Sequence, residues 1–192
     1  MLPVYITTCP KYEYLVPTFL KLIAKYWGRK VKIHYAFKDE PWSTQAIRLL
    51  EEIKSKHFIW LLEEFLLIDN VRIELLKDLE GYVVKHPEIS RIGLQSRYDG
   101  FEKVSQPYEI LDKQQLYQLN YDAEYILSLE ASIFKKETLL KYMVPGQKPW
   151  DAEVDICSKA RKEKELVLVT QDTVIPYKDA LRRGEVRYMP KI

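Results

Sequence analysis

Two adjacent carboxylates follow an uninterrupted apolar run in the first half of the chain. Residues 58–62 read Phe-Ile-Trp-Leu-Leu, and Glu63 and Glu64 come directly after them, with Asp69 a few residues further on. An apolar run of this kind is typical of a strand that is buried on both faces of a sheet. Burying a carboxylate without a partner is costly, so acids at the end of such a strand need a cation, a metal ion or water.

The acidic pair favours a hard divalent cation. Mg²⁺ and Mn²⁺ prefer oxygen ligands and commonly leave coordination sites open for phosphate oxygens. A metal ion held by Glu63 and Glu64 would offset the charge that develops on a leaving diphosphate. The alternative, that the two residues merely begin a solvated loop, remains open on the pattern alone.

The elements that must position these acids alternate between strand and helix. Helices are expected between the strands, the second with Ser43 as its N-cap and the third capped by Asp69 or Asn70. The apolar patterns predict strands over residues 4–8, 31–37, 57–62 and 90–95. This alternation predicts an α/β fold in one domain, with a mostly parallel central sheet flanked by helices.

Ligands of such sheets bind at the carboxyl ends of the strands. The stretches to inspect are therefore residues 7–12, 38–42, 63–69 and 95–99. None of them carries the glycine-rich turn of a dinucleotide site or a phosphate-binding loop, which removes most of the support for NAD or ATP.

The second half of the chain has a looser pattern. Residues 112–119 are expected to form a short helix, and residues 125–129 a strand. Helices are predicted over 137–143 and 151–163, and a late strand over 166–170.

Composition narrows the class of protein. The 192 residues carry 30 basic and 28 acidic side chains, a balance that argues against a nucleic-acid partner. No segment is apolar over the length that a transmembrane helix needs, and two cysteines are too few for a disulfide framework. We expect a cytoplasmic protein. The high charge and the six glycines fit either a hot environment or an AT-rich genome.

Three segments together resemble GT-A glycosyltransferases. The apolar run ending in Glu63-Glu64-Phe-Leu is similar to the family's "hydrophobic run, Glu-Asp, Phe-Phe-Leu" element, which takes the place of the Asp-x-Asp motif. Residues 125–140 resemble the family's "Ser-Leu-Gln-Ala-(Ala/Ser)-Ile-Trp" segment and the helix after it. Residues 149–153, Pro-Trp-Asp-Ala-Glu, resemble its "Pro-Trp-Glu-x-Glu" element. The resemblance implies a single GT-A (Rossmann-like) domain over 1–192, with a nucleotide-binding half at 1–100 and an acceptor-binding half at 101–192.

The resemblance also implies roles for the acids. Asp151 would be the general base that deprotonates an acceptor hydroxyl, and Glu153 an acid that supports it or binds the acceptor. Asp151 is explained equally well as the N-cap of the last helix. Glu63, Glu64 and Asp69 would hold the metal ion and the diphosphate, although Glu-Glu departs from the Asp-containing motif of the family and puts the metal geometry in doubt.

The family binds the nucleoside after its first strands. Thr7, Thr8, Tyr12 and Asp39 occupy those positions here. The Tyr12 ring would stack on the base and Asp39 would bond to the base or ribose, while a packing Tyr and a turn-forming Asp are the competing interpretations. Trp150 would border the sugar or acceptor pocket unless it belongs to the core.

The sequence therefore predicts a metal-assisted, inverting transfer of sugar from a nucleotide-diphosphate sugar to a glycan, protein or lipid acceptor. A sugar nucleotidyltransferase is the nearest alternative. It is disfavoured because residues 7–12, Thr-Thr-Cys-Pro-Lys-Tyr, contain no glycine. A protein that keeps the fold but has lost catalysis is the other alternative. The oligomeric state is left open.

Overall fold

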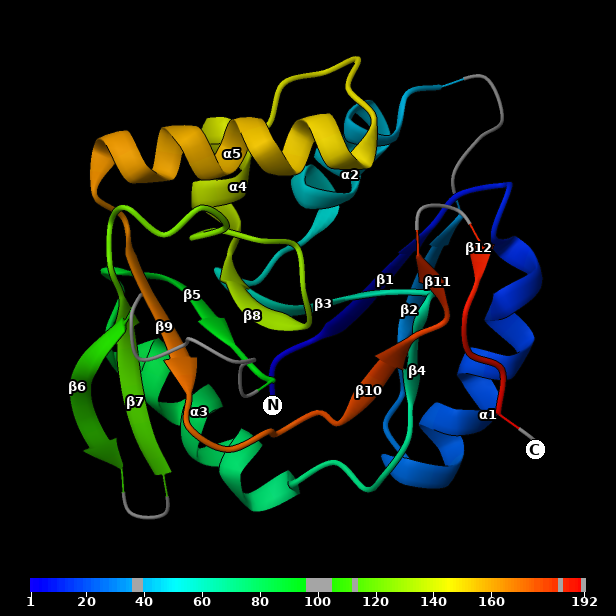
Figure 1. Ribbon diagram of the computed structural model, residues 1–192, viewed down its shortest axis with the longest axis horizontal. Coiled ribbons are helices and arrows are strands. Elements are labelled where there is room, and N and C mark those ends of the chain that lie inside the picture. Colours follow the sequence, from blue (N-terminus) through cyan, green and yellow to red (C-terminus); the bar gives the residue numbers. More distant parts are fainter. Residues whose placement is uncertain (36–39, 96–104, 112–113, 183–184, 191–192) are drawn as a thin grey trace.

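The computed structural model describes residues 1–35, 40–95, 105–111, 114–182 and 185–190, which form an α/β domain around an eight-stranded sheet (Figure 1). The strands of this sheet are β1 (Val4–Thr8), β2 (Lys32–Tyr35), β3 (His57–Leu62), β5 (Ile89–Gly93), β6 (Ser105–Leu111), β7 (Gln114–Leu119), β8 (Ser132–Lys135) and β9 (Leu166–Thr170). Their order across the sheet is β2-β1-β3-β8-β5-β9-β7-β6. Two small two-stranded sheets pair β4 (Phe65–Leu67) with β10 (Tyr177–Asp179) and β11 (Leu181–Arg182) with β12 (Glu185–Val186).

The central sheet is mixed. β1 is parallel to β2 and β3, and β5 is parallel to β9. β8 is antiparallel to both of its neighbours, β3 and β5, and β7 is antiparallel to β9 and β6. Six of the eight strands therefore run in one direction, as expected of a mostly parallel sheet, while β7 and β8 run against them.

Helices cover both faces of the sheet. They are α1 (Val16–Tyr26), preceded by a short 3-10 turn at Glu13–Leu15, α2 (Trp42–Glu52), α3 (Ile73–Lys85), α4 (Lys136–Tyr142) and α5 (Pro149–Glu163). Alternate residues of β3 separate the two cores: Phe58 and Trp60 pack with α2, α4 and α5, whereas Ile59 and Leu61 pack with α1 and α3. Burial on both faces is what the continuous apolar run of β3 indicated.

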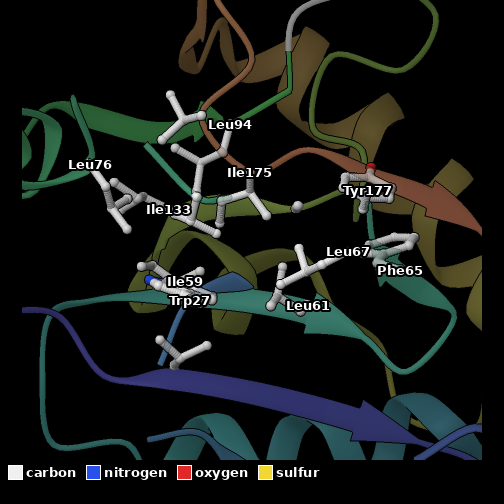
Figure 2. Packing of buried hydrophobic residues seen from close by; sticks show 14 of the residues in the cluster. Trp27, Ile59, Leu61, Phe65, Leu67, Leu76, Leu94, Ile133, Ile175 and Tyr177 are labelled. Carbon is white, nitrogen blue, oxygen red and sulfur yellow. The ribbon is translucent and has the colours of Figure 1, made fainter. Parts of the chain in front are cut away.

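The small β4–β10 sheet extends one of these cores. Phe65 and Tyr177 stack with ring centroids 4.4 Å apart, and Leu67 lies beside them among the apolar side chains above β3 (Figure 2). β4 and β10 lie 110 positions apart in the sequence, so this packing ties the C-terminal part of the chain to the end of β3.

Two predicted elements are wrong. Residues 114–119 form β7 rather than a helix, because β7 pairs with β9 on one side and β6 on the other, with Leu116 and Leu119 buried. Residues 125–129 form turns and loop rather than a strand, and their apolar side chains fill the core beneath α5 without any ladder pairing. The strand of that region, β8, begins at Ser132.

The predicted helix caps are also wrong. α2 begins after Pro41, and the Ser43 hydroxyl inside it accepts a hydrogen bond from the Gln147 backbone N–H. α3 begins after Arg72, so neither Asp69 nor Asn70 caps it. α5 begins after Lys148, which leaves Asp151 inside the first turn, where the helix dipole favours a carboxylate. Within the described residues, no helix combines the length and apolarity that crossing a bilayer needs.

Candidate active site

Glu63 lies directly beyond β3 and joins it to the end of β1. Its side chain is buried, and its Oε1 atom accepts hydrogen bonds from the Thr8 hydroxyl at 3.0 Å and the Cys9 backbone N–H at 3.1 Å. Burial raises the pKa of Glu63, while these hydrogen bonds act in the opposite direction. One carboxylate thus holds two neighbouring strand ends together.

Glu64, the next residue, is half-buried and faces a cleft. Its pKa is raised from 4.5 to about 7, first by burial and then by the negative charges of Glu63, Asp179 and Glu153. A carboxyl group with this pKa is partly protonated at neutral pH, and any cation placed beside it would restore its charge.

The cleft that Glu64 faces, here called the large cleft, has a volume of about 840 Å³. Its described lining contains acids and aromatic residues but no Lys, Arg or His. The acids are Glu64, Glu124, Glu130, Glu153 and Asp179, and the aromatic residues are Phe65, Tyr125, Trp150 and Tyr177. A ligand of the large cleft therefore meets negative charge and aromatic surface.

A smaller pocket of about 240 Å³ adjoins the large cleft at the ends of β1 and β3. Cys9, Tyr12, Trp42 and Glu63 line it. It shares four lining residues with the large cleft, namely Leu62, Glu64, Pro149 and Leu181. Glu64 therefore lies where the two cavities adjoin.

Asp179 reaches the large cleft through the pairing of β10 with β4. Asp179 is opposite Phe65 in this antiparallel ladder, and the Ala180 backbone N–H donates to the Glu64 carbonyl oxygen at 2.8 Å. Burial raises the pKa of Asp179. The sequence did not indicate this residue, because the pairing of two three-residue strands so far apart leaves no local pattern.

The two acids of α5 differ in position. Glu153 lines the large cleft, and its Oε1 atom accepts a hydrogen bond from the Leu129 backbone N–H at 2.8 Å. Asp151 is exposed and is not among the described residues that line the cleft or the small pocket. Of the two predicted catalytic acids, Glu153 is the one that shares a cavity with Glu64.

The remaining predicted site residues are dispersed. The Thr7 hydroxyl is buried in the core, where it accepts a hydrogen bond from Trp60 Nε1 at 3.0 Å. Thr8 supports Glu63, and Tyr12 lines the small pocket. Asp69 is exposed beyond the far end of β4 and lines neither cavity, and Asp39 lies outside the described residues.

The carboxylates of the large cleft fit a divalent cation of the magnesium type. Within the described parts of the chain, no three Asp, Glu, His or Cys side chains converge closely enough to form an all-protein metal cage. Mg²⁺ is usually held by one or two carboxylates and completes its coordination with water and substrate phosphates. Glu64 and Asp179, two carboxyl groups with raised pKa in a lining without a described basic side chain, match that donor set.

Beneath the large cleft lies a buried cation, Arg91 of β5. Its side chain is fully buried, its Nε donates to the Ser132 hydroxyl at 2.8 Å, and its Nη2 lies 3.6 Å from Glu130 Oε2. Gly93 lies beside it, where an added Cβ atom would be in ordinary contact with Arg91 Nη2 at 3.5 Å but only 3.0 Å from Val169 Cγ1. Arg91 thus holds one of the cleft acids from below.

Comparison with solved structures identifies the fold. Residues 1–349 of S. aureus TarS in complex with UDP-GlcNAc match with a TM-score of 0.63 and 14% identity, over 98% of this chain and 62% of that one. The same fragment without ligand gives a TM-score of 0.59 at 13% identity over 93% and 60% of the two chains, and with UDP it gives 0.57 at 12% over 92% and 59%. The chain thus spans about three fifths of the length of these structures. No family model and no curated protein matches the sequence. The likeness shows the architecture: this chain has a single-domain GT-A-like α/β fold.

Proposed function

We propose that the protein is a nucleotide-sugar-dependent glycosyltransferase. The observation that carries the proposal is the pair of adjoining cavities that share Glu64 beyond β3. A nucleotide-diphosphate sugar has three parts of different chemistry, and the two cavities with the acid at their junction offer a place for each. The UDP-GlcNAc and UDP bound in the TarS structures support this choice of donor class.

The nucleoside would occupy the small pocket. Tyr12 and Trp42 supply aromatic faces for a base, and stacking of a base on such a ring is worth about 1–3 kcal/mol in single-stranded nucleic-acid sites. Six of the eight residues lining the small pocket come from residues 1–100, whereas most of the large cleft comes from residues 101–192. This division supports a nucleotide-binding first half and an acceptor-binding second half.

The diphosphate would lie at the junction, with Glu64 and Asp179 as carboxylate ligands of Mg²⁺ or Mn²⁺. When bound, the metal ion neutralises charge on the leaving diphosphate. The need for it follows from electrostatics, because the ionised acids of a lining without a described basic side chain repel a diphosphate. Glu63 supports the junction from behind by fixing Thr8 and Cys9.

Glu153 is the general base that the geometry favours, and Asp151 is the alternative from the sequence. In an inverting transfer the acceptor oxygen bonds to the anomeric carbon, the bond from that carbon to the diphosphate breaks, and the acceptor proton passes to the carboxylate. The hydrogen bond from Leu129 to Glu153 holds one carboxylate oxygen in place, which orients the side chain toward this task.

Release of free nucleoside diphosphate tests the proposal. The protein is incubated with UDP- and GDP-sugars, Mn²⁺ and a mixture of acceptors, and Glu153→Gln is compared with Asp151→Asn. Loss of a general base lowers the rate by about 10²–10⁴-fold, so we expect that loss in Glu153→Gln and a near-normal rate in Asp151→Asn. The reverse order would make Asp151 the base. Tight nucleotide binding without turnover would instead indicate a binding protein, and pyrophosphate formed from a nucleoside triphosphate would indicate a nucleotidyltransferase.

A further inference from the structure

One aromatic side chain of the large cleft is far more exposed than the others of its type, and a second, half-buried aromatic ring lies beside it. Trp150, the second residue of α5, exposes 61% of its surface, whereas Trp60 and Trp27 are buried. The Tyr125 ring lies beside it, with ring centroids 5.9 Å apart and the planes at 55°. Both residues line the large cleft. A tryptophan left in solvent at a cleft offers a ligand a large apolar surface with a polar edge.

The surroundings of this pair are acidic and uncharged polar groups. Glu124 precedes Tyr125, Glu153 follows Trp150 by one helical turn, and Gln95 and Ser128 lie in the same lining. Ionised carboxylates only accept hydrogen bonds, so they suit a ligand that is rich in donors. Hydroxyl groups are such donors, while phosphate and carboxylate groups are not.

The aromatic pair and the acidic lining together favour one chemical class of ligand. A pyranose ring has an apolar C–H face that packs against an aromatic ring and a rim of hydroxyl groups that donate to carboxylates. An anionic acceptor, such as a phosphorylated lipid or an acidic polymer, would meet like charge in this lining, and like-charge contact is the usual basis for rejecting a partner. The described lining therefore fits a neutral sugar.

The position of Trp150 links this surface to the reaction. Residues three apart on a helix share a face, so Trp150 and Glu153 of α5 project to the same side. A sugar stacked on Trp150 would present its hydroxyl groups toward Glu153. This step rests on the proposed function, because it takes Glu153 as the base.

We propose that Trp150 and Tyr125 form the binding platform for an uncharged glycan acceptor. The platform accounts for the exposure of Trp150, for the absence of basic side chains from the described lining, and for the position of Glu153 one turn away. The acceptor is then a neutral saccharide rather than a phosphate-bearing lipid or polymer.

The test is direct binding of neutral disaccharides in the absence of nucleotide and metal ion. Binding is measured by tryptophan fluorescence and by calorimetry. Lactose, cellobiose, maltose and a mannobiose serve as probes, with glucose 6-phosphate as the anionic comparison. We expect at least one disaccharide to bind at millimolar concentration and to shift the emission of Trp150. Trp150→Ala should weaken that binding by about tenfold or more, as expected of an aromatic anchor. Tyr14→Ala, another exposed aromatic residue outside both cavities, should not.

Three results would overturn the platform: no binding by any of the neutral disaccharides, equal binding by Trp150→Ala and the wild type, or stronger binding of the phosphorylated sugar. The failure of the proposed function looks different. If disaccharides bind through Trp150 but no nucleotide-sugar is turned over, the platform stands and the transferase proposal falls. If turnover occurs and Trp150→Ala leaves the acceptor KM unchanged, the platform falls and the transferase proposal stands.

Discussion

Glu64→Gln is expected to make the ligand-free protein more stable while abolishing its metal-dependent activity. Folding raises the pKa of Glu64 from 4.5 to about 7. The folded state therefore holds this proton more tightly than the unfolded state, and stability falls as the pH rises from about 4.5 to about 7. Glutamine has a similar shape and cannot ionise, so the substitution removes this loss.

The magnitude follows from the pKa. A rise from 4.5 to about 7 corresponds to about 3 kcal/mol at full ionisation, and screening by solvent at a half-buried side chain reduces this to roughly 1–2 kcal/mol. For a protein of this size, 1 kcal/mol moves the Tm by about 2–4 °C. Thermal unfolding in chelator should therefore show Glu64→Gln several degrees above the wild type well above the pKa, and the two proteins nearly level near pH 4.5.

The same two proteins are then compared with Mn²⁺ and UDP present. Mn²⁺ with UDP should raise the Tm of the wild type, because a ligand that binds only the folded state stabilises it, and should do so much less for Glu64→Gln. Glu51→Gln, an exposed acid of α2, is the control and should behave as the wild type throughout. The reasoning fails if Glu64→Gln and the wild type lose stability in parallel as the pH rises, or if Glu64→Gln keeps full activity with Mn²⁺.

Two further predictions concern the floor of the large cleft and the small pocket. Arg91→Ala removes a fully buried cation that hydrogen-bonds to Ser132 and forms an ion pair with Glu130, and it should lower the free energy of unfolding in urea by about 3 kcal/mol. Arg187→Ala, at an exposed ion pair, should change this free energy by less than about 0.5 kcal/mol. Equal effects of the two substitutions would contradict the buried role of Arg91. Burial and the nearby Glu63 raise the pKa of the Cys9 thiol, so its alkylation should be slow at neutral pH, accelerate in alkaline buffer and be blocked by bound nucleotide. Mass spectrometry after iodoacetamide treatment measures this, and labelling that nucleotide does not affect would place the nucleoside elsewhere.

Local patterns in the sequence were sufficient for the strand that positions the site. The continuous apolar run of β3 predicted a strand that is buried on both faces, which is what the structure shows. It also predicted that the acidic pair follows the carboxyl end of this strand. β1 and β9 were predicted at residues 4–8 and 166–170, where they are found, because each is a short apolar and β-branched run. Glu63 and Glu64 are identical, adjacent residues. The sequence could not show that Glu63 accepts a hydrogen bond from Thr8 while Glu64 faces the large cleft.

The parts that were not predictable depend on partners distant in the sequence. The apolar residues of 125–129 have the composition of a strand, but they fill the core from a loop through contacts with residues far away in the sequence. Asp179 enters the cleft only because β10 pairs with β4, and both strands are too short to have a recognisable period. Asp151 and Glu153 are both carboxylic acids of the same helix, so the sequence does not distinguish them as candidate bases. Only the placement of α5 beside the large cleft shows that Glu153 lines it.

The place of β8 in the sheet governs how the chain can be assembled. β3 and β5 do not pair with each other; each pairs with β8, which is made only after both of them. A nascent chain that has emerged as far as β5 therefore exposes two strand edges that its later residues must cover, and pairings of such long range are slow to form. The first half of the chain consequently lacks the strand that joins β3 to β5 until β8 has been made.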